Sequence, residues 1–383
     1  MLRISSLLRE AYGNDSSSRA AAQNRSGVVV IWNLTNRCNL ACRHCYADAN
    51  STYWGGGEEL STQEAKGVID DLARLDVLVL ILSGGEPMLR EDLYELARYA
   101  QGQGISCALS TNGTLINEAQ ARKIGESGIR YVGISIDGAK DQHDQFRGRG
   151  GAYEASLQGI RLAREAGIKV GLRFSLTSYT ASQLPFIFDL FEQESLKKLY
   201  ISHLNYSNPT RGHLAPGPSE TRNLMGLVIE KAMGYLKEGS LAREIVTGNN
   251  EADAPFLFLA LRRQYPELAH RLYDALMRSR GNGLGPRLAN IDAWGEVHPD
   301  PFCREIYLGN VRQRPFDQIL SDLQDHFLSA LRDRKGPFHG RCGRCRFVGL
   351  CAGNSRARAF ALFSDWLGSD PLCYLTDEEI SLN

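Results

Sequence analysis

The sequence predicts an α/β fold in which a parallel sheet is covered by helices. Between residues 28 and 204, six short apolar segments alternate with longer segments of helical periodicity. Strands that are apolar along their whole length are typical of a parallel sheet buried on both faces. The chain has 383 residues, enough for two domains or for one barrel-sized domain with an appendage.

The predicted elements follow one another in a regular order. The first helix begins with a capping box, since Ser61 is followed three residues later by Glu64. The predicted strands span residues 28–33, 77–82, 106–110, 131–136, 169–176 and 199–204. The predicted helices span residues 61–75, 91–101, 117–126, 153–166 and 182–194.

Composition shifts divide the chain into four parts. Residues 1–26 are polar and predict a mobile leader or a short docking helix, and residues 27–215 hold the strand–helix unit. Residues 216–286 predict a helical linker, with helices at about 219–237 and 255–280 before a glycine-rich boundary. Residues 287–383 predict a smaller cysteine-bearing domain, with a β-hairpin within 288–308 and a helix near 316–331.

The charge balance gives no sign of a polyanionic partner. Lys plus Arg and Asp plus Glu number 44 each, so the net charge is zero and no global field favours nucleic acid or an anionic membrane. Apolar residues make up 43% and charged residues 23%, which excludes a disordered chain. The longest aliphatic run, 77–82, is too short to span a membrane, and no secretory signal is visible. We expect a cytoplasmic protein that binds neither nucleic acid nor membrane.

The nine cysteines are the unusual feature of the composition. In a reducing compartment, clustered cysteines favour metal or redox chemistry over disulfides. Cys107 lies in an apolar strand and is expected to be a small buried hydrophobe. Seven others form two groups, namely Cys38, Cys42 and Cys45, and Cys342, Cys345, Cys351 and Cys373.

The first group lies in the loop after the first predicted strand, at the edge of the sheet where ligands bind in such folds. Three thiolates on one loop can hold three irons of a four-iron cluster. The fourth iron is then open to a ligand that offers an amine and a carboxylate. Two alternatives remain: a zinc site with His44 as fourth ligand, and cysteines that bind no metal.

The spacing Cys-x3-Cys-x2-Cys followed by Tyr46 resembles the signature of the radical S-adenosylmethionine (SAM) superfamily. Four later motifs match it in order at strand ends: Ser83-Gly84-Gly85-Glu86-Pro87, Ser110-Thr111-Asn112-Gly113, Ser135-Ile136-Asp137-Gly138 and Arg173. Taken singly, these motifs are also turns or a surface charge, so the argument rests on their order.

The resemblance implies a partial (β/α)6 TIM-like barrel with a C-terminal iron–sulfur domain. It also implies reductive cleavage of SAM to methionine and a 5′-deoxyadenosyl radical, an oxidoreductase or lyase reaction. Catalytic cluster ligands would be Cys38, Cys42 and Cys45. SAM-binding residues would be Tyr46, Gly84, Gly85, Glu86, Pro87, Asn112, Ser135, Asp137 and Arg173, with the Glu86 side of its motif receiving the SAM amino group.

The second group, Cys342-x2-Cys345-x5-Cys351-x21-Cys373, supplies four thiolates, which close either a four-iron cluster or a tetrahedral zinc site. Its spacing resembles the SPASM/twitch extension of radical SAM enzymes, which implies an auxiliary [4Fe-4S] cluster and two clusters in all. Cys303 matches the first ligand of a further auxiliary cluster, but Arg314 and Ser355 replace its companions. Cys303 is then a spare thiol, a substrate-side residue or an alternative ligand.

Basic residues crowd the second cysteine group: Arg332, Arg334, Lys335, Arg341, Arg344 and Arg346. They would offset cluster charge, or attract an anionic substrate or an acidic electron donor. A solvated basic face is the plain alternative. The resemblance implies a low-potential electron donor such as flavodoxin or ferredoxin.

Residues 1–5, 30–38 and 342–380 resemble the tetrapyrrole-modifying members of the superfamily, and among these the enzymes of heme d1 biosynthesis. This resemblance implies an anionic tetrapyrrole substrate, 12,18-didecarboxysiroheme, whose propionate side chains are removed or rearranged toward the 3,8-dioxo pattern of heme d1. Guanidinium groups suit carboxylates, and imidazole or phenol groups could approach the iron. The candidates are Arg147, Arg149, Arg211, His143, His203, Tyr206 and His213.

Three alternatives stay open. A sister enzyme that decarboxylates heme precursors shares the same motifs. A peptide-modifying SPASM enzyme usually carries a separate peptide-recognition domain, for which residues 1–26 are too short. An iron–sulfur electron carrier or scaffold explains the cysteines but not Glu86, Ser135 and Arg173 at the strand ends.

Overall fold

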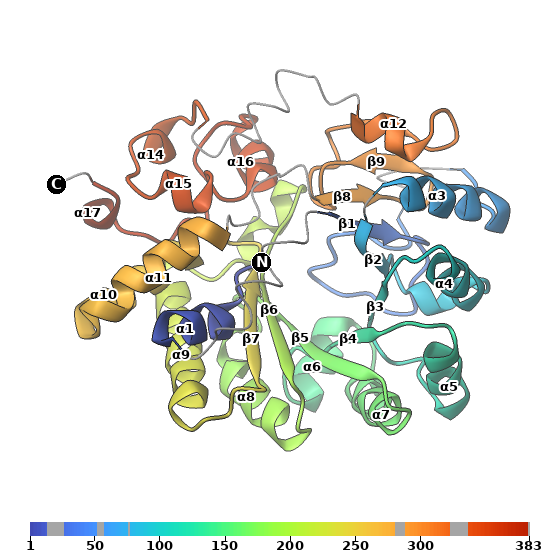
Figure 1. Ribbon diagram of the computed structural model, residues 1–383, viewed down its shortest axis with the longest axis horizontal. Coiled ribbons are helices and arrows are strands. Elements are labelled where there is room, and N and C mark those ends of the chain that lie inside the picture. The colour runs from blue at the N-terminus through green and yellow to red at the C-terminus, as the bar shows by residue number, and fades with distance from the viewer. Residues whose placement is uncertain (14–26, 52–56, 76, 280–287, 322–335, 382–383) are drawn as a thin grey trace.

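The computed structural model describes residues 1–13, 27–51, 57–75, 77–279, 288–321 and 336–381. Over these residues, ten strands form one sheet in the order β10-β9-β8-β1-β2-β3-β4-β5-β6-β7. Figure 1 shows the strands fanned into an open arc, with helices along its outer side. The predicted α/β class and partial barrel are confirmed.

Seven consecutive strands of the arc, β1 to β7, run parallel, and each pairs with the next. The six strands predicted from the sequence all form, within one residue of the expected bounds. The seven strands are β1 (Val28–Asn33), β2 (Val77–Ser83), β3 (Cys107–Thr111), β4 (Tyr131–Ser135), β5 (Lys169–Leu176), β6 (Lys198–His203) and β7 (Glu244–Gly248).

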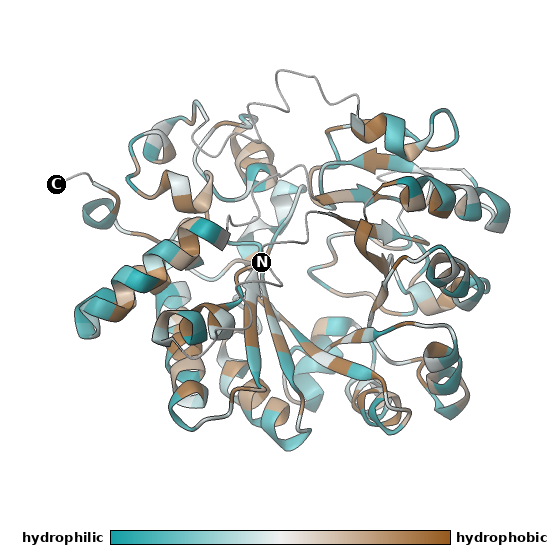
Figure 2. Cartoon of the chain, in the orientation of Figure 1, coloured by the Kyte–Doolittle hydropathy of each residue, from teal (hydrophilic) through white to brown (hydrophobic). Residues whose placement is uncertain are grey.

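The helices on the outer side form because apolar residues recur along one face, which packs on the sheet. In Figure 2 these faces are brown toward the strands and teal outward. The predicted capping box is present, because Glu64 N donates to Ser61 Oγ and Ser61 N donates to Glu64 Oε2. The helices are α3 (Thr62–Arg74), α4 (Leu93–Gly102), α5 (Glu118–Glu126), α6 (Lys140–Arg147), α7 (Ala152–Glu165) and α8 (Leu184–Gln193), with 3-10 turns η1 (Pro87–Leu89), η2 (Ala181–Gln183) and η3 (Pro209–Leu214).

The N-terminal part forms a docking helix, α1 (Ile4–Tyr12). Ile4 and Leu8 are fully buried in the main core. Leu2 N donates to Thr247 O, which joins the chain start to β7. Residues 4–12 therefore form the short docking helix that was one of the two predictions for this part of the chain. Residues 14–26 of the predicted leader lie outside the described residues.

The region expected to be a helical linker contains more than helices. Its strand β7 was not predicted from the sequence because only Ile245 and Val246 are aliphatic in it, which gives no apolar run. The helix expected over 255–280 is two helices, because Pro266 lacks an N–H and disfavours helical backbone at Tyr265. The helices of this region are α9 (Pro218–Lys237), α10 (Asp253–Gln264) and α11 (Pro266–Ser279).

The predicted C-terminal hairpin forms from β8 (Leu288–Ile291) and β9 (Glu296–His298). Strand β8 pairs in parallel with β1, so the hairpin extends the barrel sheet instead of standing apart. The expected helix near 316–331 is present as α12 (Phe316–Ser321), and its remainder lies outside the described residues. The other elements are β10 (Gly309–Asn310), α14 (Gly340–Gly343), α15 (Val348–Cys351), α16 (Arg356–Phe363) and α17 (Asp377–Ile380).

Among the described helices, none combines the length and the apolar character needed to cross a membrane.

Candidate functional site

A cavity of about 170 Å³ lies at the carboxyl ends of the parallel strands. The cavity therefore lies at the edge of the sheet where the strand order predicts ligand binding. Nine of the predicted site residues line the cavity: Cys38, Cys42, Cys45, Tyr46, Gly84, Gly85, Asn112, Ser135 and Arg173. Residues 38–47, 83–85, 110–112, 173–175 and 202–205 supply most of the wall, so loops from distant parts of the chain meet there.

Glu86 is placed behind this wall and is fully buried. Its carboxylate accepts hydrogen bonds from Thr111 Oγ1 at 2.7 Å, Asn112 N at 2.8 Å and Met88 N at 3.1 Å. Burial raises the pKa of Glu86, and these three hydrogen bonds act in the opposite direction. The side chain thus joins the loop after β2 to the end of β3. Pro87 begins η1 and is also absent from the cavity wall.

Asp137 is likewise buried behind the wall. Its Oδ2 lies 2.5 Å from Arg147 Nη2, and its Oδ1 accepts from Ser175 N at 2.8 Å. The Asp137 N–H donates to His143 Nδ1 at 3.0 Å. Arg147 Nη1 also lies 3.5 Å from Cys42 Sγ. Arg147 therefore links a buried carboxylate to a predicted cluster ligand.

The two glycines after β2 pack against the loop after β1 that carries Cys38, Cys42 and Cys45, which we call the cysteine loop. A Cβ at Gly84, whose φ is +144°, would lie 2.5 Å from Thr35 O, and a Cβ at Gly85 would lie 2.3 Å from Arg37 O. Gly85 N donates to Thr35 O at 2.7 Å. Glycine is required at both positions because the neighbouring backbone leaves no room for a Cβ.

Two aromatic rings from opposite ends of the chain cover one side of the cavity. Tyr46 donates to Asn33 Oδ1 at 3.2 Å, and its ring centre lies 5.2 Å from that of Phe302. Phe302 lines the cavity and comes from the C-terminal part. The sequence reasoning missed Phe302, and the only available signal was its position beside Cys303.

The zinc alternative makes a prediction about the spacing of the thiols. One zinc ion with bonds of about 2.3 Å brings sulfur ligands to roughly 3.8 Å from one another. Among the described residues, the only three metal-binding side chains whose ligand atoms all lie within 4.8 Å of one another are Asp292, Glu296 and His298. Neither cysteine group therefore has three sulfur atoms that all lie within 4.8 Å of one another.

Burial raises the pKa of Cys38 to about 11 and also raises the pKa of Cys42. Thiolates, not thiols, bind iron, so cluster insertion must release protons. The zinc alternative named His44 as a ligand. Its Nε2 lies 3.0 Å from Ser175 Oγ, its ring stacks on Phe146, and burial lowers the pKa of His44 to about 3.

The four C-terminal cysteines come together around one small cavity, which Arg341 and Asn354 also line. Cys342 N donates to Ser369 Oγ at 3.1 Å, and Phe347 N donates to Cys345 Sγ at 3.4 Å. The predicted second group is therefore a spatial cluster. Of the six basic residues near it, Arg332, Arg334 and Lys335 lie outside the described residues.

The other two cysteines lie apart from both cavity walls. Cys107 is buried in β3, where burial raises the pKa of its thiol to about 12. Cys303 is buried in a small apolar cluster with Ile306 and Ala357, and its Sγ lies 3.5 Å from Asp300 Oδ2. Ser355 caps α16 and donates through Oγ to Asn205.

All three guanidinium groups expected to bind substrate carboxylates contact the cysteine loop, and Arg147 also lines the cavity. Arg149 Nη1 donates to Asn39 O at 3.4 Å, and Arg211 donates to Arg43 O at 2.5 Å and pairs with Asp48. Among the expected iron-facing groups, His203 lines the cavity. Its Nε2 lies 3.0 Å from Asp253 Oδ2. His143, Tyr206 and His213 are not part of the wall.

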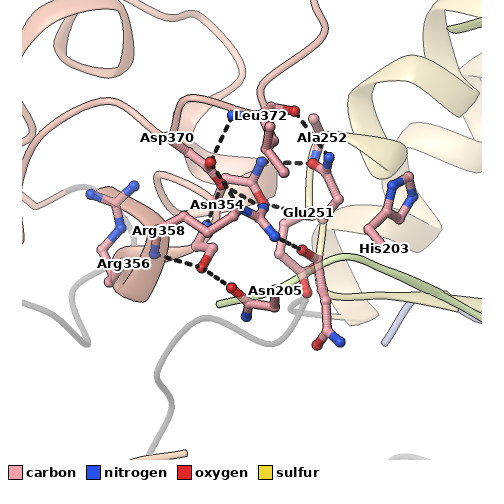
Figure 3. A network of polar contacts seen from close by, with 12 residues as sticks. His203, Asn205, Glu251, Ala252, Asn354, Arg356, Arg358, Asp370 and Leu372 are labelled. Atoms are coloured by element: carbon pink, nitrogen blue, oxygen red, sulfur yellow. Dashed lines mark hydrogen bonds and ion pairs between the residues drawn. The ribbon is translucent and has the colours of Figure 1, made fainter. Parts of the chain in front are cut away.

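A buried polar network joins the C-terminal part to this wall (Figure 3). Arg358 donates to both carboxylate oxygens of Asp370, at 3.0 and 2.6 Å, and to Leu204 O and Asn249 O. Both ionised side chains are fully buried. Leu204 and Asn249 line the cavity, so the auxiliary cysteine region is fixed directly to it.

Comparison with known proteins agrees with this geometry. Residues 32–184 match the family model of the Radical SAM superfamily. The chain is 41% identical to Fe-coproporphyrin III synthase of Methanosarcina barkeri, covering 92% of this chain and 89% of the relative. It is 42% identical to Pre-heme d1 synthase of Dinoroseobacter shibae, covering 99% and 93%.

The fold also matches a solved structure, native anSMEcpe with bound AdoMet, with a TM-score of 0.68 and 18% identity, covering 90% of this chain and 93% of that chain. That likeness concerns the fold. The matched motifs, their order at the strand ends and the nearly full-length relatives lead to one conclusion: the chain belongs to the radical SAM superfamily.

Proposed function

We propose that this chain is a radical SAM enzyme of heme d1 biosynthesis, which removes or rearranges propionate side chains of 12,18-didecarboxysiroheme toward the 3,8-dioxo pattern. The main support is its sequence similarity, along nearly the whole chain, to two synthases named for an iron porphyrin and for a heme d1 precursor. The cavity at the strand ends, which the three thiols of one loop line, supports the same chemistry.

Family membership implies SAM and one [4Fe-4S] cluster, whose ligands would be Cys38, Cys42 and Cys45. When bound, these groups supply reductive cleavage of SAM to methionine and a 5′-deoxyadenosyl radical, which abstracts hydrogen from the substrate. We assign a second, auxiliary [4Fe-4S] cluster to Cys342, Cys345, Cys351 and Cys373, and the position of all four thiols around one small cavity supports this assignment. A low-potential flavodoxin or ferredoxin in the cytoplasm would deliver the electron.

The remaining residues of the wall position and shield the reactants. Tyr46 and Phe302 place apolar surface over the cavity, which limits the access of water to a radical. Arg173 is held by Ser110 Oγ at 2.9 Å and lies over the Tyr200 ring. A guanidinium fixed in this way can bind a carboxylate of SAM or of the substrate. We assign roles toward SAM to Tyr46, Asn112, Ser135 and Arg173, and their place in the wall supports this assignment.

The radical chemistry is tested by Cys42→Ala. The anaerobically reconstituted variant should produce no 5′-deoxyadenosine from SAM under reductant, because the first cluster loses a ligand. The matched control is Cys107→Ala, since Cys107 is buried in β3 and lies outside both cavities. The proposal fails if Cys42→Ala keeps the activity that Cys107→Ala shows.

The substrate is tested by supplying 12,18-didecarboxysiroheme with SAM and reductant, and by following the tetrapyrrole by mass spectrometry. Loss or rearrangement of propionate side chains supports the heme d1 assignment. Loss of other side chains, or turnover of Fe-coproporphyrin III in its place, supports the sister heme-precursor enzymes. Formation of 5′-deoxyadenosine without any change in either tetrapyrrole would overturn the substrate assignment while leaving the radical chemistry intact.

A further inference from the structure

Arg356 is a buried cation without an anionic hydrogen-bond partner. It is the first residue of α16 and is 2% exposed. Its Nη1 donates to the carbonyl oxygens of Trp366 at 3.0 Å and Gly368 at 2.7 Å. Its Nε and Nη2 are buried and have no hydrogen-bond partner among the described residues. Burying a charge in this way is unfavourable unless another charge compensates it.

Asp370, the carboxylate that acts most strongly on Arg356, does not fill this role. Arg358 binds both of its oxygens, so its charge is already paired. In Figure 3 the Arg356 guanidinium turns away from the Arg358–Asp370 pair. One face of the Arg356 guanidinium lies 5.0 Å from the centre of the Phe338 ring, which supplies no charge.

Gly353 links Arg356 to one of the auxiliary thiols. A Cβ at Gly353 would lie 3.0 Å from Arg356 Nη2, and Gly353 O accepts from Cys342 Sγ at 3.9 Å. Gly353 therefore lies close to both the guanidinium and a predicted cluster ligand. Burial lowers the pKa of Arg356, and the charges that oppose this most are those of Cys342, Asp370 and Cys351.

We propose that Arg356 is the buried counter-charge of the auxiliary [4Fe-4S] cluster and raises its reduction potential. The inference rests on the auxiliary cluster assigned above. A cluster with four thiolates is anionic, and reduction adds one negative charge. A cation fixed in a medium of low dielectric constant stabilises the reduced form more than the oxidised form. Net charge and hydrogen bonding around the sulfurs are known to tune such potentials.

The other arginines near the four thiols are placed less favourably for this role. Arg341 is neutralised by Asp377, at 2.8 Å, and Arg344 is exposed. Arg346 is half-buried and lies over the Phe347 ring. Charges at exposed positions are screened by water and salt. Arg356 alone of these four is fully enclosed.

The test is a potentiometric titration of the reconstituted full-length protein, followed by electron paramagnetic resonance. Cys38→Ala, Cys42→Ala and Cys45→Ala are introduced together, so that only the auxiliary cluster contributes. Arg356→Gln removes the charge but keeps a donor for the Trp366 and Gly368 carbonyl oxygens, and its midpoint potential should move to more negative values. Arg356→Lys keeps the charge and should stay close to the parent protein.

Arg344→Met is the matched control, because it removes an equal charge from the exposed side of the same cysteine segment. Its potential should move less than that of Arg356→Gln. An unchanged potential in Arg356→Gln, or a shift no larger than that of Arg344→Met, overturns the role of Arg356. Iron analysis separates the two proposals: a parent protein without iron in this background overturns the auxiliary cluster itself, whereas about four irons per chain confirm it.

Discussion

Arg147 and Asp137 form a buried ion pair beside the cysteine loop, with 2.5 Å between Arg147 Nη2 and Asp137 Oδ2. The two side chains are 8% and 0% exposed. Burial would raise the pKa of Asp137, but Arg147 and the neighbouring histidines hold it below its ordinary value. Since Arg147 also contacts Cys42 Sγ, the pair fixes the position of a predicted cluster ligand.

Arg147→Met should lower the free energy of unfolding by about 3–5 kcal/mol, because Asp137 keeps a buried charge without its cation. Denaturant unfolding of the metal-free protein near neutral pH measures this loss. The control is Arg161→Met, because Arg161 is 49% exposed and pairs with Glu194. That variant should lose no more than about 1 kcal/mol. Equal losses in the two variants would contradict the importance of the buried pair.

Gly85→Ala should prevent assembly of the first cluster. The new Cβ would meet Arg37 O at 2.3 Å, so the backbone leading into Cys38 must shift. Iron content should fall from about eight to about four per chain, and 5′-deoxyadenosine formation should fall by more than about tenfold, since misplaced reacting groups slow a reaction steeply.

Gly67→Ala is the matched control for this change. Gly67 lies inside α3, and a Cβ there would have nothing within 4 Å. Alanine favours a helix over glycine by about 0.5–1 kcal/mol, so this variant should be slightly more stable and keep its iron. If Gly85→Ala also kept all its iron, the loop would be shown to tolerate the contact.

The sequence predicts the parallel strands and both cysteine groups well, because apolar runs and thiol spacing are local signals. It does not predict what each motif residue contacts. Glu86 and Asp137 belong to recognisable motifs, yet their buried carboxylates bind Asn112 N and Arg147, two residues of the cavity wall. Asn112 follows the next strand after Glu86, and Arg147 ends the helix after Asp137, so only the folded chain shows which side chains meet.

Longer-range features were harder still to predict. Strand β7 is short, and its pairing with β6 depends on tertiary structure. Phe302 reaches the cavity only because β8 pairs with β1 and carries the C-terminal part to the barrel mouth. Arg356 and Arg358 look alike in the sequence, two residues apart on one short helix. Only the structure distinguishes the paired guanidinium from the one without an anionic partner.

The ion pair between Glu64 and Arg312 should make stability depend on pH. Hydrogen bonds from Arg312 and then Ser61 lower the pKa of Glu64 from 4.5 to about 2. A carboxyl with a lowered pKa stabilises the fold above its ordinary pKa, and this contribution is lost as the pH falls from about 4.5 toward 2. Both side chains are more than one-third exposed, so the effect should stay below about 1 kcal/mol.

Thermal unfolding of the parent protein and Glu64→Gln measures this effect. Their midpoint temperatures should differ near neutral pH, and the difference should shrink as the pH is lowered through about 4. Glu126→Gln changes an exposed glutamate at the end of α5 and serves as the control. A difference that stays constant at all pH values would contradict the assigned ion pair.

Arg358→Met should detach the C-terminal part from the barrel, because Arg358 is the residue that binds Asp370, Leu204 O and Asn249 O together. Removing one partner of a buried ion pair costs about 3–5 kcal/mol, and two carbonyl groups at the cavity wall lose a donor as well. The carbonyls belong to the loops after β6 and β7, so the damage is concentrated at the junction and not spread through the barrel.

Limited proteolysis of the metal-free protein shows which part of the chain is destabilised. Cleavage should become faster within residues 336–381, while the segments that form α3 to α7 stay protected, since proteolysis follows local opening. The matched control, Arg278→Met, breaks the pair between Arg278, which is 47% exposed, and Glu10, and should leave the cleavage pattern unchanged. Uniformly faster cleavage in Arg358→Met would mean that the network stabilises the whole barrel, and unchanged cleavage would mean that the surrounding apolar contacts hold the C-terminal part without it.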